Sequence, residues 1–138
     1  SSLVVSPCQY GLLDYDGRGL SYQTVETDVS AWAAAKGRQE AELLDFGVYC
    51  RKFFADNCYR QVNEMYAESG KSEDEITLLA ETFAQLNQDY FAGALSDYVA
   101  LERGIELWRA QEKNFAQMYI ETMCAIEHDS RSFEIAVK

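Results

Sequence analysis

The sequence contains little proline, little histidine and little positive charge. One proline and one histidine occur among 138 residues, and 12 basic residues stand against 23 acidic ones, which gives a net charge of -11. A field of that sign repels phosphate backbones and anionic lipid surfaces, so it argues against nucleic acid or a membrane surface as partner. We therefore expect the partner to be another protein, one with a basic surface.

Long apolar runs are missing as well. No stretch approaches the ~18 apolar residues of a membrane span, and the densest one, residues 30–36, is far shorter. The first residues also lack the basic and apolar segments of a signal peptide, an absence that leaves the compartment open. With 48% hydrophobic and 13% aromatic residues, the chain still has ample core material for one soluble globular domain.

Capping residues divide the chain into helical segments. Gly70 suits the left-handed end of one helix, and Ser72 with Glu75 forms a capping box for the next. Gly93 offers a further break, which is needed because one helix over the remaining apolar stripe would be too long for a compact domain. Thr24 or Thr27 would cap the first helix. The predicted helices are 23–36, 38–68, 73–93 and 97–128.

These segments predict an all-α fold, an up-and-down bundle of about four helices in a single domain of residues 1–138. Residues 1–22 would be an irregular segment with a tight turn, residues 23–128 the bundle, and residues 129–138 an extended tail. Both termini show the two-residue period of strands, at 3–5 and at 132–137. We allow for a minor strand pair between them, or for a tail that adds to a partner's sheet.

One stretch near the N-terminus resembles a calcium loop in part. Asp14, Asp16 and Gly19 stand where an EF-hand loop places two carboxylates and its glycine. Arg18 and Val25, however, occupy positions that must donate oxygen ligands. The dipeptide of Asp16 and Gly17 favours a hairpin-like turn instead, so we predict a turn and no calcium.

The single histidine lies near a possible reactive group. Cys124 and His128 are four residues apart on a predicted helix, and Glu121 precedes Cys124 by three. Such a trio could ligate zinc, and the thiol beside the imidazole could be an activated nucleophile. The simpler interpretation is a histidine that interacts favourably with a helix C-terminus.

Four cysteines are spread along the chain, an even number that suits two disulfides in an oxidising compartment. Cys50 and Cys58 lie too far apart on one helix to be bridged to each other. The bundle topology then pairs Cys58 with Cys124 and Cys8 with Cys50. These pairs predict an extracytoplasmic location, whether periplasmic, secreted or lumenal, although four reduced thiols would suit a cytosolic protein.

No glycine-rich phosphate loop, nucleophile elbow or paired zinc spacing occurs in the sequence. We therefore expect a non-enzymatic, acidic helical domain that binds another protein without a cofactor, as an inhibitor, immunity protein, adaptor or extrinsic subunit does. One alternative is a carrier of a small apolar ligand, held in a cavity between aromatic side chains. The other is a metal- or thiol-dependent enzyme that uses Cys124 and His128.

Overall fold

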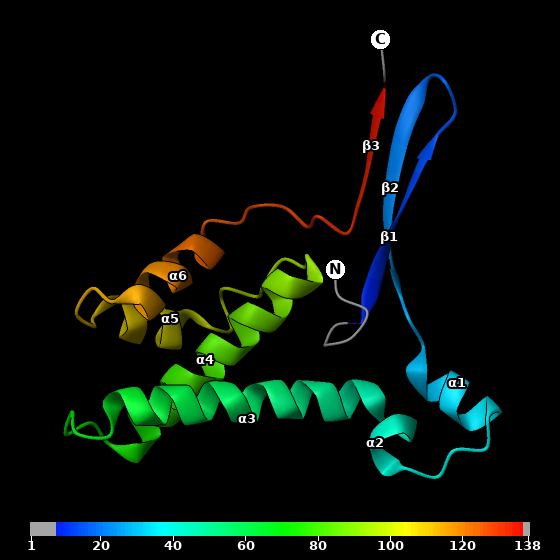
Figure 1. Cartoon of the computed structure of the whole chain (residues 1–138). Coiled ribbons are helices and arrows are strands. Elements are labelled where there is room, and N and C mark those ends of the chain that lie inside the picture. Colours follow the sequence, from blue (N-terminus) through cyan, green and yellow to red (C-terminus); the bar gives the residue numbers. More distant parts are fainter. Residues whose placement is uncertain (1–7, 137–138) are drawn as a thin grey trace.

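The computed structural model describes residues 8–136 (Figure 1). These residues form six helices and three strands, in the order β1, β2, α1 to α6, β3. The fold is therefore mixed, and the prediction of an all-α bundle is wrong. The residues on both sides of the helices are extended because they pair with one another, which a helical period cannot indicate.

The sheet is antiparallel and has β2 at its centre. It consists of β1 (Gln9–Tyr15), β2 (Gly19–Glu26) and β3 (Ser132–Ala136), in the order β1-β2-β3. The predicted turn at Asp16 and Gly17 is confirmed, and Gly17 takes a φ of 87°. Residues 9–15 are nevertheless strand rather than irregular chain. The C-terminal strand also forms, and it pairs with β2. The partner expected at residues 3–5 lies outside the described residues.

The first predicted helix begins too early. Residues 23–26 belong to β2, where β1 pairs with all four of them and β3 pairs with Gln23, and α1 spans Val29–Ala35. The cap is Asp28, whose side chain accepts a hydrogen bond from Ala31 N at 2.8 Å, and not either threonine.

The second predicted helix divides into α2 (Ala41–Leu44) and α3 (Phe46–Tyr66). The break falls at Asp45, whose φ of -115° is not helical. Ser30 of α1 contributes to the new start, because its hydroxyl accepts a hydrogen bond from the amide of Phe46 at 3.2 Å. An amide that a helix would otherwise leave without a partner is satisfied in this way.

Helix α4 (Glu73–Ala92) agrees with the sequence at both ends. Ser72 and Glu75 form the predicted capping box, and Gly93 ends the helix with a φ of 71°. The prediction for 97–128 is wrong, because α5 (Glu102–Arg109) and α6 (Phe115–Cys124) are separate helices. Asn114 starts α6 by accepting a hydrogen bond from Gln117 N at 2.8 Å.

The hydrophobic core lies where α3, α4, α5 and α6 meet. Its centre is Trp108, fully buried, with its indole N–H donating to the Leu79 carbonyl at 2.9 Å. The rings of Tyr66 and Phe83 lie 6.1 and 5.8 Å from the ring of Trp108. Helices α4 and α5 approach closely at Gly104, where a Cβ atom would lie 1.8 Å from Thr82 Oγ1. This core is therefore entirely helical.

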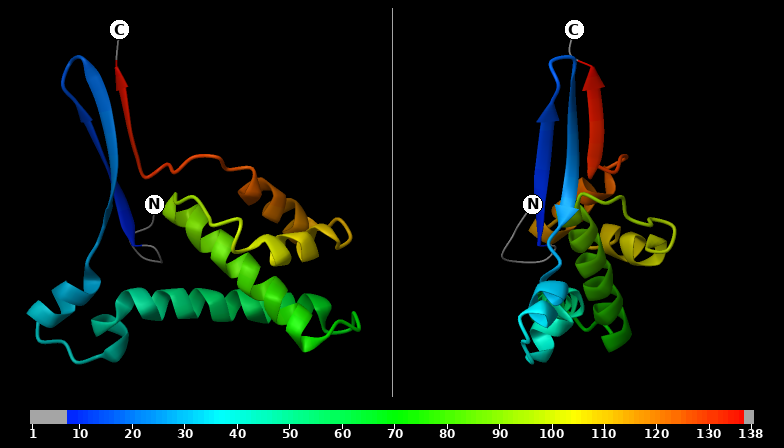
Figure 2. Two further views of the ribbon diagram at one scale, coloured as in Figure 1. Left: turned by 180° about the vertical axis from the view of Figure 1, so that it is seen from behind. Right: turned by 90° about the vertical axis from the view of Figure 1, so that its right-hand side faces the viewer.

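The sheet stands apart from the helices (Figures 1 and 2). Among residues 8–136 the extensive contacts of each strand are with other strands, and no helix packs broadly against the sheet. The helical part is joined to it at two neighbouring strands, since the amide of Thr24 in β2 donates to the carbonyl of Arg131, the residue just before β3, at 2.7 Å. The assignment of residues 1–138 to one domain stays a prediction.

Candidate docking surface

One face of the sheet is apolar. Residues that stand opposite each other in a sheet point to the same side, so the register defines two rows across the three strands. The first row is Leu13, Tyr22 and Phe133, and the second is Tyr15, Leu20 and Ile135. We name these six residues the apolar sheet face.

The middle of this face is an aromatic stack. The rings of Tyr22 and Phe133 lie 5.1 Å apart at an interplanar angle of 15°. Gly11 makes room for the tyrosine, because a Cβ atom at Gly11 would lie 2.6 Å from Tyr22 Cε2. The face is therefore shaped by specific side chains rather than by hydrophobic content alone.

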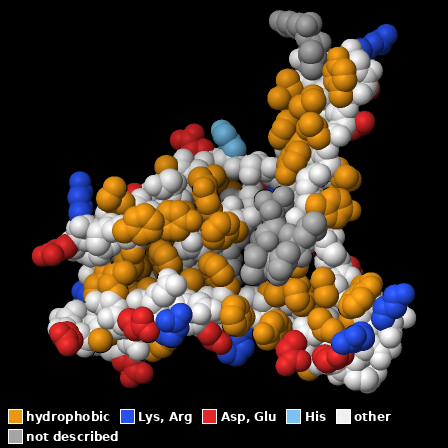
Figure 3. Space-filling model, in the orientation of Figure 1, with side chains coloured by type: hydrophobic (Ala, Val, Ile, Leu, Met, Phe, Trp, Pro, Cys, Tyr) orange, Lys and Arg blue, Asp and Glu red, His pale blue; other side chains and the backbone are white. Residues whose placement is uncertain are grey.

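The apolar sheet face is largely open to solvent. The exposed fractions are 64% for Leu13, 58% for Tyr15 and 54% for Ile135. Figure 3 shows hydrophobic side chains gathered along the side of the strands that faces the helices, with no helix seated on them. Contiguous apolar surface of this kind is a candidate docking surface.

The opposite face of the sheet is more polar. Asp14, Ser21 and Glu134 form one row across it, whereas no charged residue belongs to the two apolar rows. Leu12 lies on this polar side, directly beside Leu13 in the chain. An antiparallel sheet with one apolar and one polar face is typical of a layer that is covered on the apolar side only.

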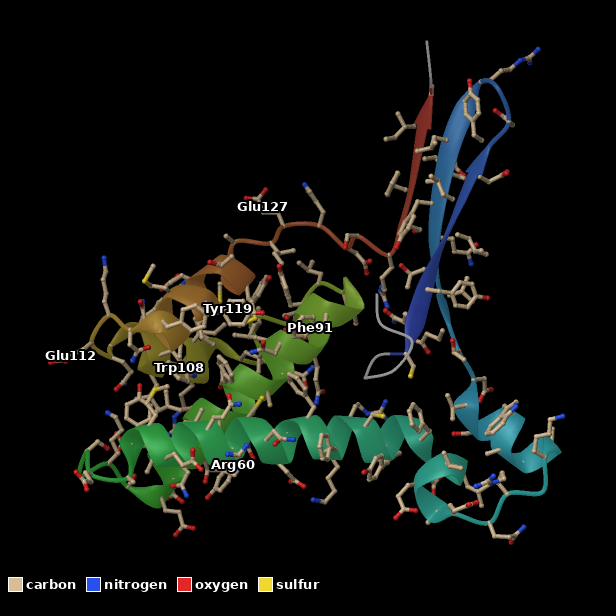
Figure 4. The ribbon with its side chains drawn as sticks, viewed as in Figure 1. Arg60, Phe91, Trp108, Glu112, Tyr119 and Glu127 are labelled. Carbon is tan, nitrogen blue, oxygen red and sulfur yellow. The ribbon has the colours of Figure 1, made fainter. Side chains whose placement is uncertain are left out.

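A second apolar surface runs across the helices. Successive ring centroids lie 5.6 to 6.3 Å apart in a row from α6 through α4 to α3, formed by Phe115, Tyr119, Tyr90, Phe91 and Phe54. Figure 4 shows Phe91 at the end of α4 that lies toward the sheet. Part of this aromatic row is well exposed, with Phe115 at 84% and Phe91 at 50%.

Two larger clefts adjoin the sheet. One of about 1000 Å³ lies between β2, β3 and residues 129–131, and one of about 680 Å³ lies between the start of β1 and helices α1, α3 and α4. Polar side chains dominate both linings, including Arg131 in the first and Arg51 in the second. An apolar ligand would gain little contact there, so these clefts do not favour the carrier hypothesis.

Of the two carboxylates in the suspected calcium loop, that of Asp16 stabilises the turn. Asp16 Oδ1 accepts hydrogen bonds from the amides of Arg18 and Gly19 at 2.8 and 2.7 Å, and these bonds lower the pKa of Asp16. Asp14 points from β1 to the polar side of the sheet. Within the described part of the chain, no three His, Cys, Asp or Glu side chains are grouped to hold a metal ion.

Calcium is expected to leave the melting temperature unchanged. Only binding to the folded state raises it, and the Asp16 carboxylate is already engaged by two amides while Arg18 and Val25 offer no side-chain oxygen. The measurement is a thermal melt across a millimolar calcium titration, with a chelator added back as control. A clear rise that the chelator reverses would contradict the turn assignment.

Among the described residues, the three members of the suspected catalytic or zinc site do not form a group that could hold a metal ion. Glu121 pairs with Arg109 of α5 through two hydrogen bonds of 3.0 and 3.2 Å. Helix α6 ends at Cys124, so His128 lies in the following segment and not one turn further along a helix. Burial raises the pKa of Cys124, which opposes a reactive thiolate.

The structure contradicts one of the two predicted disulfides. Cys58 and Cys124 are free thiols, so the predicted bridge between them is not formed. Cys58 is buried in α3, and burial raises its pKa to about 11. Cys8 and Cys50 line the same 680 Å³ cleft, and their pairing stays a prediction. The extracytoplasmic location stays a prediction as well.

The absence of a membrane span is supported as far as the structure describes the chain. None of the helices between residues 8 and 136 has the combined length and apolar character that crossing a bilayer requires.

The fold and its uncovered surface define a helical domain carried on a small antiparallel sheet. Residues 28–129 match the family described as the C-terminal domain of cyclic nucleotide phosphodiesterase, and the chain belongs to this family. No curated protein matches the sequence significantly. The matched span contains all six helices, whereas β2 ends at Glu26 before it and β3 begins at Ser132 after it.

Proposed function

We propose that this chain is a non-catalytic C-terminal domain that binds the catalytic part of its cognate cyclic nucleotide phosphodiesterase. The observation that carries the proposal is the uncovered apolar sheet face beside a helical segment of that family. A C-terminal domain adjoins the rest of its protein, and an apolar face of this kind is stable when another layer covers it. The chain thus keeps the predicted role of a protein-binding domain.

The side chains that sequence analysis named as catalytic candidates have other roles. Glu121 holds Arg109, and the Cys124 thiol is half-buried with a raised pKa. A nucleophile or general base would need the opposite environment, with an accessible thiolate or an unpaired carboxylate. These contacts favour a domain whose contribution to the enzyme is binding.

The charge of the chain suggests what surrounds the apolar contact. The net charge of -11 favours a partner with basic residues at the rim, and it disfavours nucleic acid. The apolar sheet face itself has no charged member. We therefore expect an interface with an apolar centre and a charged edge, which is the usual arrangement between proteins.

Isothermal titration calorimetry between this chain and the separately expressed catalytic part tests the proposal. Binding is expected, with the negative heat-capacity change that burial of apolar surface produces. The chain alone is expected to hydrolyse no cyclic nucleotide above the buffer rate. Hydrolysis by the isolated chain, or no binding to the catalytic part, would contradict the proposal.

A further inference from the structure

We infer that the outer edge of β3 binds an extended segment of a partner protein, which joins the sheet as a fourth antiparallel strand and places a lysine or arginine opposite Glu134. This contact uses the main chain along one edge of the sheet, whereas the proposed function rests on the apolar sheet face. The two are therefore tested separately.

The main chain of β3 has one side turned to β2 and one side turned outward. Within residues 8–136, β3 pairs with β2 and forms an edge of the sheet. The Thr24 amide donates to the Arg131 carbonyl, and in an antiparallel pair the hydrogen-bonding residues then alternate along the strand. Phe133 and Ile135 therefore bond to β2. The residues whose amides and carbonyls point outward are Ser132, Glu134 and Ala136.

The outer edge of β3 is open to another strand. All five residues of β3 are exposed, and Figure 2 shows β3 (red) beside β2 with no other strand of the described chain along its outer side. An open row of amides and carbonyls is a template for strand pairing, and extended peptides bind proteins in this way.

The charge of the strands indicates which side chain the added strand carries. The polar row Asp14, Ser21 and Glu134 ends at β3 with a carboxylate, and β1 to β3 contain no Lys or Arg. Among the described residues, neither Asp14 nor Glu134 takes part in an ion pair. Arg131, just before β3, is already bound to Asp129 at 3.0 and 2.8 Å. A basic residue opposite Glu134 supplies the missing opposite charge.

The two apolar rows indicate the neighbours of that basic residue. They end at β3 with Phe133 and Ile135, which flank Glu134 in the chain and point to the other face of the sheet. A fourth strand continues both rows when apolar residues flank its basic residue. The segment that fits is thus an extended one with the order apolar, basic, apolar.

A second copy of β3 is a poorer occupant of this edge. Antiparallel pairing of two copies over all five residues places the two copies of Glu134 directly opposite each other, and like charges in that position destabilise a sheet. Each chain also carries a net charge of -11, which opposes self-association further. The inference therefore commits to a basic segment of another protein.

The edge formed by β1 offers a different pattern. At the turn the Asp16 amide donates to the Gly19 carbonyl at 3.3 Å, and the alternation from there turns the main-chain groups of Leu13 and Tyr15 outward. Neither residue is charged, whereas Glu134 presents its main chain and a carboxylate at the same position. Leu13 and Tyr15 thus serve as internal controls for the location of the added strand.

Nuclear magnetic resonance with two synthetic peptides tests the inference. One capped seven-residue peptide has valine, lysine, valine at its centre and threonines on both sides, and the other has glutamate in place of the lysine. The lysine peptide is expected to slow hydrogen exchange of the Ser132, Glu134 and Ala136 amides and to leave Leu13 and Tyr15 unchanged. It should bind about tenfold more tightly than the glutamate peptide, since an attractive cross-strand pair replaces a repulsive one.

Reversing the charge in the chain provides the second test. Glu134→Lys is expected to make the glutamate peptide the tighter ligand by about tenfold. Glu127→Lys changes the net charge equally but lies in the segment between α6 and β3 (Figure 4), so it should keep the preference for lysine. Circular dichroism checks that both variants keep the helical fold, whose buried cluster contains neither residue.

Several outcomes would overturn the inference while leaving the proposed function untouched. They are no binding of the lysine peptide at millimolar concentration, equal affinity for the two peptides, and protection of Leu13 and Tyr15 in place of the β3 amides. Concentration-dependent protection of the β3 amides in the isolated chain would show self-association at this edge, and the inference would again be wrong.

Discussion

Replacing Trp108 with alanine is expected to lower the free energy of unfolding by about 4 kcal/mol, the range for a large aromatic residue removed from a core. Trp108 is fully buried, and its ring packs against Tyr66 and Phe83 at the meeting point of the helices. The substitution leaves a cavity and removes the hydrogen bond to the Leu79 carbonyl. Urea denaturation followed by circular dichroism at 222 nm, a wavelength that reports helix content, measures the loss.

The other tryptophan is the matched control. Trp32 of α1 is 51% exposed and lies outside the buried cluster, so Trp32→Ala should change stability by less than about 1 kcal/mol. Trp108→Phe keeps most of the packing volume but loses the indole donor, and it should fall between the two alanine variants. Equal losses for the two tryptophans would show that the core is not centred on Trp108.

Gly104→Ala is expected to destabilise the chain by about 2 kcal/mol or more, although alanine is normally the better helix former. The new Cβ atom would lie 1.8 Å from Thr82 Oγ1 and 2.8 Å from Thr82 Cβ, closer than atoms can approach. Thr82 is itself buried, and its hydroxyl donates to the Leu78 carbonyl at 2.8 Å, so it has little freedom to move aside. Helices α4 and α5 would have to separate.

Gly47 provides the control for this prediction. It is the second residue of α3, and the nearest atom to a Cβ there is the tip of Arg51 at 3.5 Å. Gly47→Ala should therefore stabilise the chain through helix propensity alone, by less than the ~1 kcal/mol of a helix interior. Thr82→Ala combined with Gly104→Ala should cost less than the sum of the single changes, because the alanine removes the closest atom. Strict additivity in urea denaturation would contradict direct contact between the two positions.

Local capping chemistry made part of the fold predictable from the sequence. Ser72, Glu75 and Gly93 bound α4 as expected, because each residue acts on the nearest turn of backbone. The Asp16 and Gly17 turn was predictable for the same reason. The end of α5 and the start of α6 were missed, although Asn114 is a good capping residue and could have indicated the break.

The sheet could not be predicted in the same way. Strand β2 is central because both β1 and β3 pair with it. Strand β3 follows β2 by more than a hundred positions, and pairing over that distance depends on the fold between them. The alternation of Phe133 and Ile135 indicates a strand, but the alternation does not identify the strand with which it pairs. The sequence alone therefore does not reveal one surface formed by Leu13, Tyr22 and Phe133, since only the strand register brings them into a row.

The hydrogen bond between the Thr24 amide and the Arg131 carbonyl has an evolutionary consequence. Because the chain leaves β2 and returns to β3 at hydrogen-bonded neighbours, a hairpin loop of a few residues would span the same gap as the whole helical segment. Gain or loss of that segment would preserve the strand register on both sides. The helices thus form an insert between two neighbouring strands, and a change in the length of this insert would leave the pairing of β2 with β3 intact.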